Sequence, residues 1–199
     1  METRFLLVRH PQTEANVDGR LVGRGDTPYT NRGERQRELL IARIAEWTPD
    51  VVLSSPLRRA MEVAERASAR CDVPLELDER LTEIDFGVAE GLTHDEIAGR
   101  DIEFDFRSLD RPVCEGGESR RSIYERSAAA AQDASGLRVA IVSHGGVFRS
   151  LVAHLCGFPI DHIWSFDIQP SAVCEIRVMD GFGLLHAFAP SVDEEPVGP

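Results

Sequence analysis

Positive charge is scarce in this chain of 199 residues. It carries 22 lysines and arginines against 34 aspartates and glutamates, which gives a formal net charge of −12 at pH 7. Such a chain lacks the broad basic surface that binds nucleic acid or an anionic membrane, because those partners are held largely through phosphate neutralisation. A small anionic substrate stays compatible with the composition if a local cluster of arginines overrides the global charge.

Long hydrophobic runs are also missing. No apolar stretch approaches the roughly 20 residues that a membrane-spanning helix requires. The N-terminal segment METRFLLVRH has too short an apolar core for a secretory signal peptide. We therefore expect a cytoplasmic protein with no membrane partner.

Paired cysteines and the common metal-binding motifs are absent as well. The chain has no CxxC pair, so neither a zinc site nor a disulfide framework is indicated, and we expect free thiols at Cys71, Cys114, Cys156 and Cys174. The six histidines form no HExxH motif and no cluster with aspartates, which disfavours a metal-dependent hydrolase. The sequence predicts no cofactor.

The chain is rich instead in alternating strand and helix patterns. With 42% hydrophobic residues it can bury a sizeable core, and we expect one domain over residues 1–190. Short apolar runs at 4–8, 51–55 and 138–144 have the length and composition of buried strands. The last segment, 191–199, is acidic, carries two prolines and has no periodicity, so it is expected to form a solvated tail.

Helical segments lie between these strands and carry capping residues at their ends. We expect a helix over 31–47 with Thr30 as N-cap, and another over 57–70 with Ser55 as N-cap. The other expected elements are a short helix begun by the capping box of Thr93 and Glu96, a helix after His144 that Gly157 ends, a helix over 119–133, and irregular structure over 102–112.

The pattern changes near the C-terminus, where 172–180 and 184–190 flank a turn-prone GFG and predict an antiparallel pair. We thus expect a three-layer α/β/α sandwich, in which a mostly parallel sheet with an antiparallel edge is covered by helices on both faces. Ligands of such sheets bind at the carboxyl ends of the strands. The polar residues that fall there are Arg9, His10, Ser54, Ser55 and His144.

Five motifs follow one another in a specific order: VRHPQTEAN, GRLVGRGDTPYTNRGERQ, SSPLRRAMEVA, RLTEIDFGVAEG and VSHGG. Together they resemble the histidine phosphatase superfamily, which has the phosphoglycerate mutase-like fold. The matches extend from Leu6 to about Arg149, and a GGES segment at 116–119 is similar too. The resemblance is greatest to small members such as α-ribazole phosphatases and broad-specificity phosphatases. It implies a metal-independent phosphomonoesterase that hydrolyses a small phosphorylated metabolite through a phosphohistidine.

The resemblance also implies roles for particular residues. His10 matches the nucleophile and Glu83 the proton donor, with Asp85 as an alternative acid. The residues matching the phosphate pocket are Arg9, Asn16, Arg59 and His144, and Arg20 lies in a GRxxG loop that helps to shape it. In the LxRA pattern the pocket arginine directly precedes the alanine, so Arg58 is expected to be a surface charge.

The chemistry of these side chains fits phosphoryl transfer by itself. The reaction needs positive charge around the phosphoryl oxygens, which two guanidiniums and an imidazole supply. A nucleophilic imidazole must be neutral, and neighbouring arginines disfavour its protonated form. Because a departing alkoxide is strongly basic, a nearby carboxylic acid is needed to protonate it.

Two alternatives stay open. Mutases of the superfamily return the phosphoryl group to the substrate, but they usually carry a longer segment between the acid and the second histidine, which favours a phosphatase here. Pro11 replaces the glycine that is usual in the family, and it removes an N–H and fixes φ. A non-catalytic phosphate-binding module is therefore the second alternative. The sequence predicts neither the particular substrate nor the oligomeric state.

Overall fold

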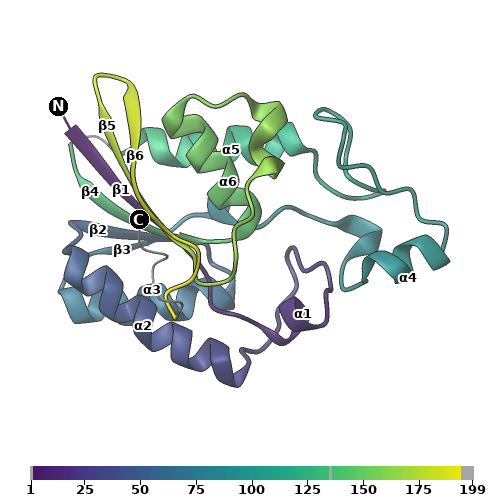
Figure 1. Ribbon diagram of the computed structural model, residues 1–199, viewed down its shortest axis with the longest axis horizontal. Helices are drawn as coiled ribbons and strands as arrows, with labels where there is room; N and C mark the ends of the chain where they lie inside the picture. Colours follow the sequence, from purple (N-terminus) through teal and green to yellow (C-terminus); the bar gives the residue numbers. More distant parts are fainter. Residues whose placement is uncertain (1, 135, 194–199) are drawn as a thin grey trace.

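Six strands form one sheet at the centre of the structure, a computed structural model that describes residues 2–134 and 136–193. The strands are β1 (Glu2–Arg9), β2 (Val51–Ser54), β3 (Leu75–Leu77), β4 (Arg138–Ser143), β5 (Val173–Met179) and β6 (Phe182–Ala189). Their order in the sheet is β3-β2-β4-β1-β5-β6. The first four of these are parallel, and β5 and β6 add an antiparallel edge (Figure 1). The predicted sheet is confirmed, except that β3 was too short to be recognised from its period.

Helices cover both faces of the sheet. The longer ones are α2 (Asn31–Trp47) and α3 (Arg58–Cys71) on one face, and α5 (Arg120–Gln132) and α6 (Gly145–Cys156) on the other (Figure 1). The shorter ones are α1 (Glu14–Val17), α4 (His94–Gly99) and the 3₁₀ helices η1 (Glu79–Leu81), η2 (Gly87–Ala89) and η3 (Ile160–Ser165). Residues 102–112 contain neither helix nor strand, as predicted.

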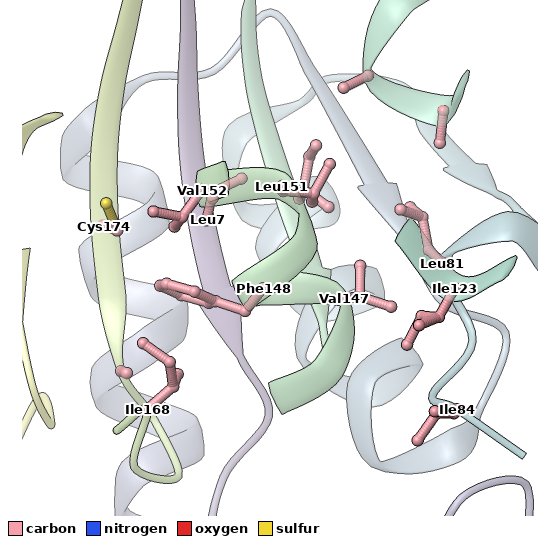
Figure 2. Close-up of a cluster of buried hydrophobic side chains, with 14 of the residues drawn as sticks. Leu7, Leu81, Ile84, Ile123, Val147, Phe148, Leu151, Val152, Ile168 and Cys174 are labelled. Atoms are coloured by element: carbon pink, nitrogen blue, oxygen red, sulfur yellow. The ribbon is translucent and has the colours of Figure 1, made fainter. Parts of the chain in front are cut away.

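The alternation of side chains along β1 creates two cores. Leu7 packs with Phe148 and Leu151 of α6 on one face (Figure 2). Leu6 and Val8 belong to the cluster on the opposite face, which α2 and α3 cover. Successive residues of a strand point to opposite faces, so an uninterrupted apolar run is what a sheet buried on both sides requires. This packing on both sides fixes β1, whose carboxyl end carries the polar residues predicted from the sequence.

Several helix ends lie where the sequence predicts them. Thr30 accepts a hydrogen bond from the Gly33 N–H at the start of α2, and Thr93 and Glu96 form the capping box of α4. Gly157 adopts φ 72° after α6, a conformation that favours glycine. These ends were predictable because capping depends on residues within one turn of each other.

The start of α3 differs from the prediction. Leu57, and not Ser55, is the N-cap, and the helix begins at Arg58. The Ser55 hydroxyl accepts a hydrogen bond from Leu57 N–H at 3.2 Å and also contacts the ring of His144 at 2.7 Å. Ser55 therefore does not cap the helix, which starts three residues later, and its hydroxyl contacts His144 at the carboxyl ends of the strands instead.

The first three residues of the predicted tail, 191–193, contact the domain. Ser191 is buried and contacts the Ser171 hydroxyl, and Asp193 forms an ion pair with Arg32 at 2.7 Å. Residues 191–193 thus pack with the domain, in contrast to the solvated segment that the composition predicts. The rest of that segment, 194–199, lies outside the described residues. Within the described part of the chain, no helix has both the length and the apolar character needed to cross a membrane.

Candidate active site

A cavity of about 180 Å³ opens at the carboxyl ends of β1 and β4. It brings together six of the seven residues to which the sequence assigns a role in chemistry or phosphate binding, and the seventh, His144, lies directly behind His10. The cavity is lined by Arg9, His10, Thr13, Asn16, Arg20, Leu21, Val22, Thr27, Arg59, Glu83, Phe86, Gly145, Gly146, Arg149 and Trp164. A larger cavity of about 550 Å³ beside residues 101–115 contains none of the predicted residues.

His10 follows β1 and is held by the backbone on both sides. Its N–H donates to the Ser143 carbonyl and its carbonyl accepts from Ser171 N–H, each at 2.9 Å. Nδ1 of the ring lies 2.7 Å from the carbonyl oxygen of Pro11. Since a carbonyl only accepts, Nδ1 carries the proton and Nε2 keeps its lone pair. Burial, and then the charges of Arg59 and Arg9, hold the pKa of His10 well below its ordinary value.

His144 is the N-cap of α6 and is fully buried. Its ring centroid lies 5.3 Å from that of His10, and its Nε2 contacts the Ser55 hydroxyl at 2.7 Å. Nδ1 is buried and has no hydrogen-bond partner among the residues that the structure describes. Burial and the charge of Arg59 hold the pKa of His144 well below its ordinary value, so this ring is neutral as well.

Two arginines bring positive charge to the cavity. Arg9 ends β1 and donates to the carbonyl of Ile168. Arg59, in the first turn of α3, donates to the carbonyls of Gly23 and Gly25, each at 2.7 Å. Burial lowers the pKa of Arg9 to about 10 and lowers that of Arg59, while the nearby charge of Glu83 opposes both shifts. Both guanidiniums therefore stay charged at neutral pH.

Glu83 is the carboxylate in contact with this cavity, and it is 9% exposed. Its Oε1 accepts from Ile84 N–H at 2.9 Å, and both oxygens accept from Gly146 N–H at 3.1 Å. A Cβ at position 146 would lie 2.4 Å from Oε1, so any side chain there would displace the Glu83 carboxyl group from this position. The start of α6 thereby fixes the position of the carboxyl group.

Asp85 and Arg58 lie outside the cavity. Asp85 accepts from Gly87 N–H at 2.8 Å and forms an ion pair with Arg24 at 3.2 Å. The geometry therefore favours Glu83 over Asp85 as the acid. The Arg58 side chain is 71% exposed and pairs with Glu62, as the sequence predicts for a surface charge.

Asn16 and Arg20 complete the predicted set at the edge of the cavity. Asn16 uses its Oδ1 to accept from Thr13 N–H at 3.0 Å, which leaves its amide N–H groups for a ligand. Arg20 is engaged by Glu96 and by the Gly91 carbonyl, both at 2.8 Å. Asn16 is thus prepared to bind an anion, whereas Arg20 shapes the rim through its own ion pair.

Two further residues of the cavity, Arg149 and Trp164, were not predicted from the sequence. The Arg149 guanidinium lies 5.0 Å from the centre of the Trp164 ring, and its Nε donates to the Phe166 carbonyl at 2.7 Å. Burial lowers the pKa of Arg149. Arg149 could have been found from the sequence. It lies four residues after Gly145 of the VSHGG motif, and residues four apart share one face of a helix. Trp164 belongs to a 3₁₀ helix with no such signal.

The fold and this site define a class of protein. The chain belongs to the histidine phosphatase superfamily (branch 1), whose family model matches residues 5–189. Similar proteins include several named as phosphatases and others named as probable phosphoglycerate mutases, and the chain is a phosphatase of this superfamily. Within the described residues, no group of three or more histidines, cysteines or acidic side chains is arranged to hold a metal ion.

Individual relatives cover most of the chain. It is 32% identical over 172 residues to the glucosyl-3-phosphoglycerate phosphatase of Mycolicibacterium vanbaalenii, which covers 80% of this chain and 76% of that protein. It is 31% identical to the adenosylcobalamin/alpha-ribazole phosphatase of Salmonella typhimurium, with 92% and 94% covered. The solved structure of Bacillus stearothermophilus YhfR superposes with a TM-score of 0.81 at 33% identity, with 92% and 95% covered.

Proposed function

We propose that this phosphatase hydrolyses the monoester of a small phosphorylated metabolite through a phosphohistidine at Nε2 of His10. The observation that carries the proposal is the 2.7 Å contact between Nδ1 of His10 and the carbonyl of Pro11. It fixes the proton on Nδ1 and leaves the lone pair on Nε2, and the lowered pKa keeps the ring neutral. A neutral, oriented imidazole is the form that attacks phosphorus.

The phosphoryl group is held by donors from separate elements. Arg9 and Arg59 provide the positive charge that phosphoryl transfer requires. The third donor is Nδ1 of His144, which is buried without a partner in the described residues. If the Ser55 hydroxyl donates to Nε2 of His144, the ring proton lies on Nδ1 and is available to a phosphoryl oxygen.

Glu83 serves both steps of the reaction. In the first step the N–P bond forms, the P–O bond to the organic group breaks, and Glu83 gives its proton to the departing oxygen. In the second step the carboxylate takes a proton from water, which attacks the phosphohistidine and releases phosphate and free His10. The hydrogen bonds from Ile84 and Gly146 N–H hold the carboxylate at the cavity for both steps.

Pro11 does not favour the alternative of a non-catalytic module. The bond that orients His10 uses the carbonyl of residue 11 and no N–H, so a proline can make it as well as a glycine. The mutase alternative is disfavoured by the comparatively short segment between Glu83 and His144. Hydrolysis is therefore the reaction that we propose.

The relatives are named for different phosphorylated compounds, so the proposal names a class of substrate and not one metabolite. We also propose a cytoplasmic location. The cysteines Cys71, Cys114, Cys156 and Cys174 are free thiols, which fits a reducing compartment.

The test is a panel of phosphorylated metabolites with phosphate release as readout, run with and without a chelator. We expect release that survives chelation. Activity that is lost on chelation and restored by a divalent metal would support a metal-dependent hydrolase instead. Isomerisation of phosphoglycerate without phosphate release would support a mutase, and phosphate binding with no turnover of any ester would support a non-catalytic module.

A further inference from the structure

A short loop, residues 22–25 with the sequence VGRG, reaches the cavity at Val22, and we refer to it as the glycine loop. Its Gly23 packs directly against the backbone of Ile84, the residue after Glu83. A Cβ at position 23 would lie 2.2 Å from the carbonyl oxygen of Ile84, and one at position 25 would lie 2.8 Å from Oε1 of Glu90. Backbone therefore excludes a side chain at Gly23, and a side chain at Gly25 would displace the Glu90 carboxylate.

Glu90 holds the N–H groups of this loop. It is the C-cap residue of η2, and its half-buried carboxylate accepts from Gly23 N–H with both oxygens at 3.0 Å and from Gly25 N–H with Oε1 at 2.9 Å. Hydrogen bonds to an ionised acceptor are stronger than neutral ones. Glu90 itself does not line the cavity.

Arg59 holds the carbonyl groups of the same loop. Its guanidinium donates to the carbonyls of Gly23 and Gly25 at 2.7 Å, and to that of Val22 at 3.4 Å. The peptide unit between Val22 and Gly23 thus has its N–H on Glu90 and its C=O on Arg59. Its dipole is aligned between the two charges, and hydrogen bonds in such a chain strengthen one another.

Through this arrangement the negative charge of Glu90 acts on Arg59 by way of the glycine loop, without direct contact between the two side chains. Arg59 is only 3% exposed, and the carboxylates whose charges raise its pKa, which are Glu83, Asp26 and Glu90 in that order, form no ion pair with it in the described residues. Its direct partners are the carbonyls of the glycine loop, so the orientation of the guanidinium depends on where that loop lies. The glycine loop and Glu90 together provide that orientation and leave the other N–H groups of Arg59 for the phosphate.

We propose that Glu90 is a positioning residue, which fixes the Arg59 guanidinium for phosphate through the glycine loop. The proposal rests on the function proposed above only in that Arg59 binds the phosphoryl group. Removing Glu90 is expected to act at a distance, because displacing a catalytic group by about 1 Å costs up to about 100-fold.

The test is a double-mutant cycle on Glu90 and Arg59, read by the affinity for inorganic phosphate in calorimetry and by kcat/KM for nitrophenyl phosphate. We expect Glu90→Ala to weaken both by about 10- to 100-fold. In an Arg59→Ala background the same change should cost less than about threefold, because its target is gone. Glu90→Gln keeps one oxygen acceptor but no charge, so an intermediate loss is expected.

Asp50→Asn is the matched control. Asp50 also accepts from a backbone N–H, that of Arg138 at 2.7 Å, but at the opposite end of the strands. This variant should leave both readouts unchanged. If Glu90→Ala does not fold, Glu90→Gln carries the cycle, and its loss must again disappear in the Arg59→Ala background.

Equal losses in the two backgrounds, or a phosphate affinity in Glu90→Ala within about threefold of wild type, would overturn the proposal. A protein that binds phosphate but hydrolyses no ester would refute the proposed function alone. The effect of Glu90 on Arg59 could still be measured in that case, through the double-mutant cycle on phosphate affinity. Failure of the wild-type protein to bind phosphate would overturn both.

Discussion

The cavity has two walls that are built in different ways. The sheet wall consists of Arg9, His10, Gly145 and Gly146, and regular backbone fixes it: β1 pairs with β4 in the register Arg9 to Ser143, and α6 starts directly after His144. The other wall is Trp164, which belongs to a segment that we name the arch, residues 158–168 together with residues 102–112. Trp164 brings the arch to the cavity, and its ring contacts that of Phe106 at a centroid distance of 4.9 Å.

Hydrogen bonds from arginine side chains fix the arch, whereas backbone pairing between strands fixes the sheet wall. Arg120 donates to the carbonyls of Phe106 at 2.8 Å and Asp161 at 3.0 Å, and Arg149 donates to that of Phe166. An irregular segment leaves carbonyls without ladder partners, and these must find other donors. Because backbone pairing holds the sheet wall and single side chains hold the arch, we expect the covalent step at the sheet wall and contacts to the organic part of the substrate at the arch.

The largest expected effect comes from the sheet wall. His10→Ala removes the nucleophile, so turnover should fall by about 10⁴-fold or more. Wild-type enzyme incubated with substrate should carry an acid-labile, base-stable phosphate label that the variant lacks. A label that persists in the variant would assign the covalent step to another residue.

Glu83→Gln should divide the two steps of the reaction. It keeps the shape of the side chain but has no proton to give, so an alkyl phosphate should lose about 10²- to 10⁴-fold in rate. Release of nitrophenol should be nearly unaffected, because that leaving group is a stable anion, and a burst followed by slow hydrolysis is expected in rapid-mixing kinetics. An equal loss of burst rate for both esters would favour Asp85 as the acid.

A smaller effect is expected from the arch. Arg120→Ala leaves four carbonyls of the arch without this donor, which should lower the free energy of unfolding by about 1–3 kcal/mol. It should raise KM for the natural substrate while kcat for nitrophenyl phosphate changes little. Arg121→Ala is the matched control, since the adjacent Arg121 pairs with the exposed Asp110 and neither parameter should change. Similar results for both variants would remove the distinction between the two walls.

The smallest expected effect is a pH dependence of stability that originates in the sheet wall. Burial and neighbouring cations hold the pKa values of His10 and His144 below normal in the folded state. The unfolded chain then binds more protons, so the free energy of unfolding should decrease as the pH falls below about 6.5. Urea midpoints at about pH 7.5 and about pH 5.5 should differ less in His10→Asn than in wild type. Equal differences would show that His10 is not held neutral by the fold.

The sequence was sufficient for the sheet wall and insufficient for the arch. The composition of residues 4–8 indicates β1, and the polar residues that follow lie at its end, so the positions of Arg9 and His10 were predictable from local pattern alone. The arch has no period, and its position depends on arginines such as Arg120 that lie far from it in the chain. An arginine that binds carbonyls is indistinguishable in sequence from one in a surface ion pair.

By itself, the sequence determined the order of strands and helices, the caps at Thr30 and Thr93, and the motifs that bring His10 and Glu83 to one site. Those features follow from residues within a few positions of each other, whose periodicity and capping act locally. Only the tertiary structure decided the contacts between distant residues. Ser55 contacts His144, which lies 89 residues away in the sequence, and Glu90 accepts a hydrogen bond from Gly23, which lies 67 residues away. Such contacts depend on how the layers pack around the sheet, and no local pattern encodes them.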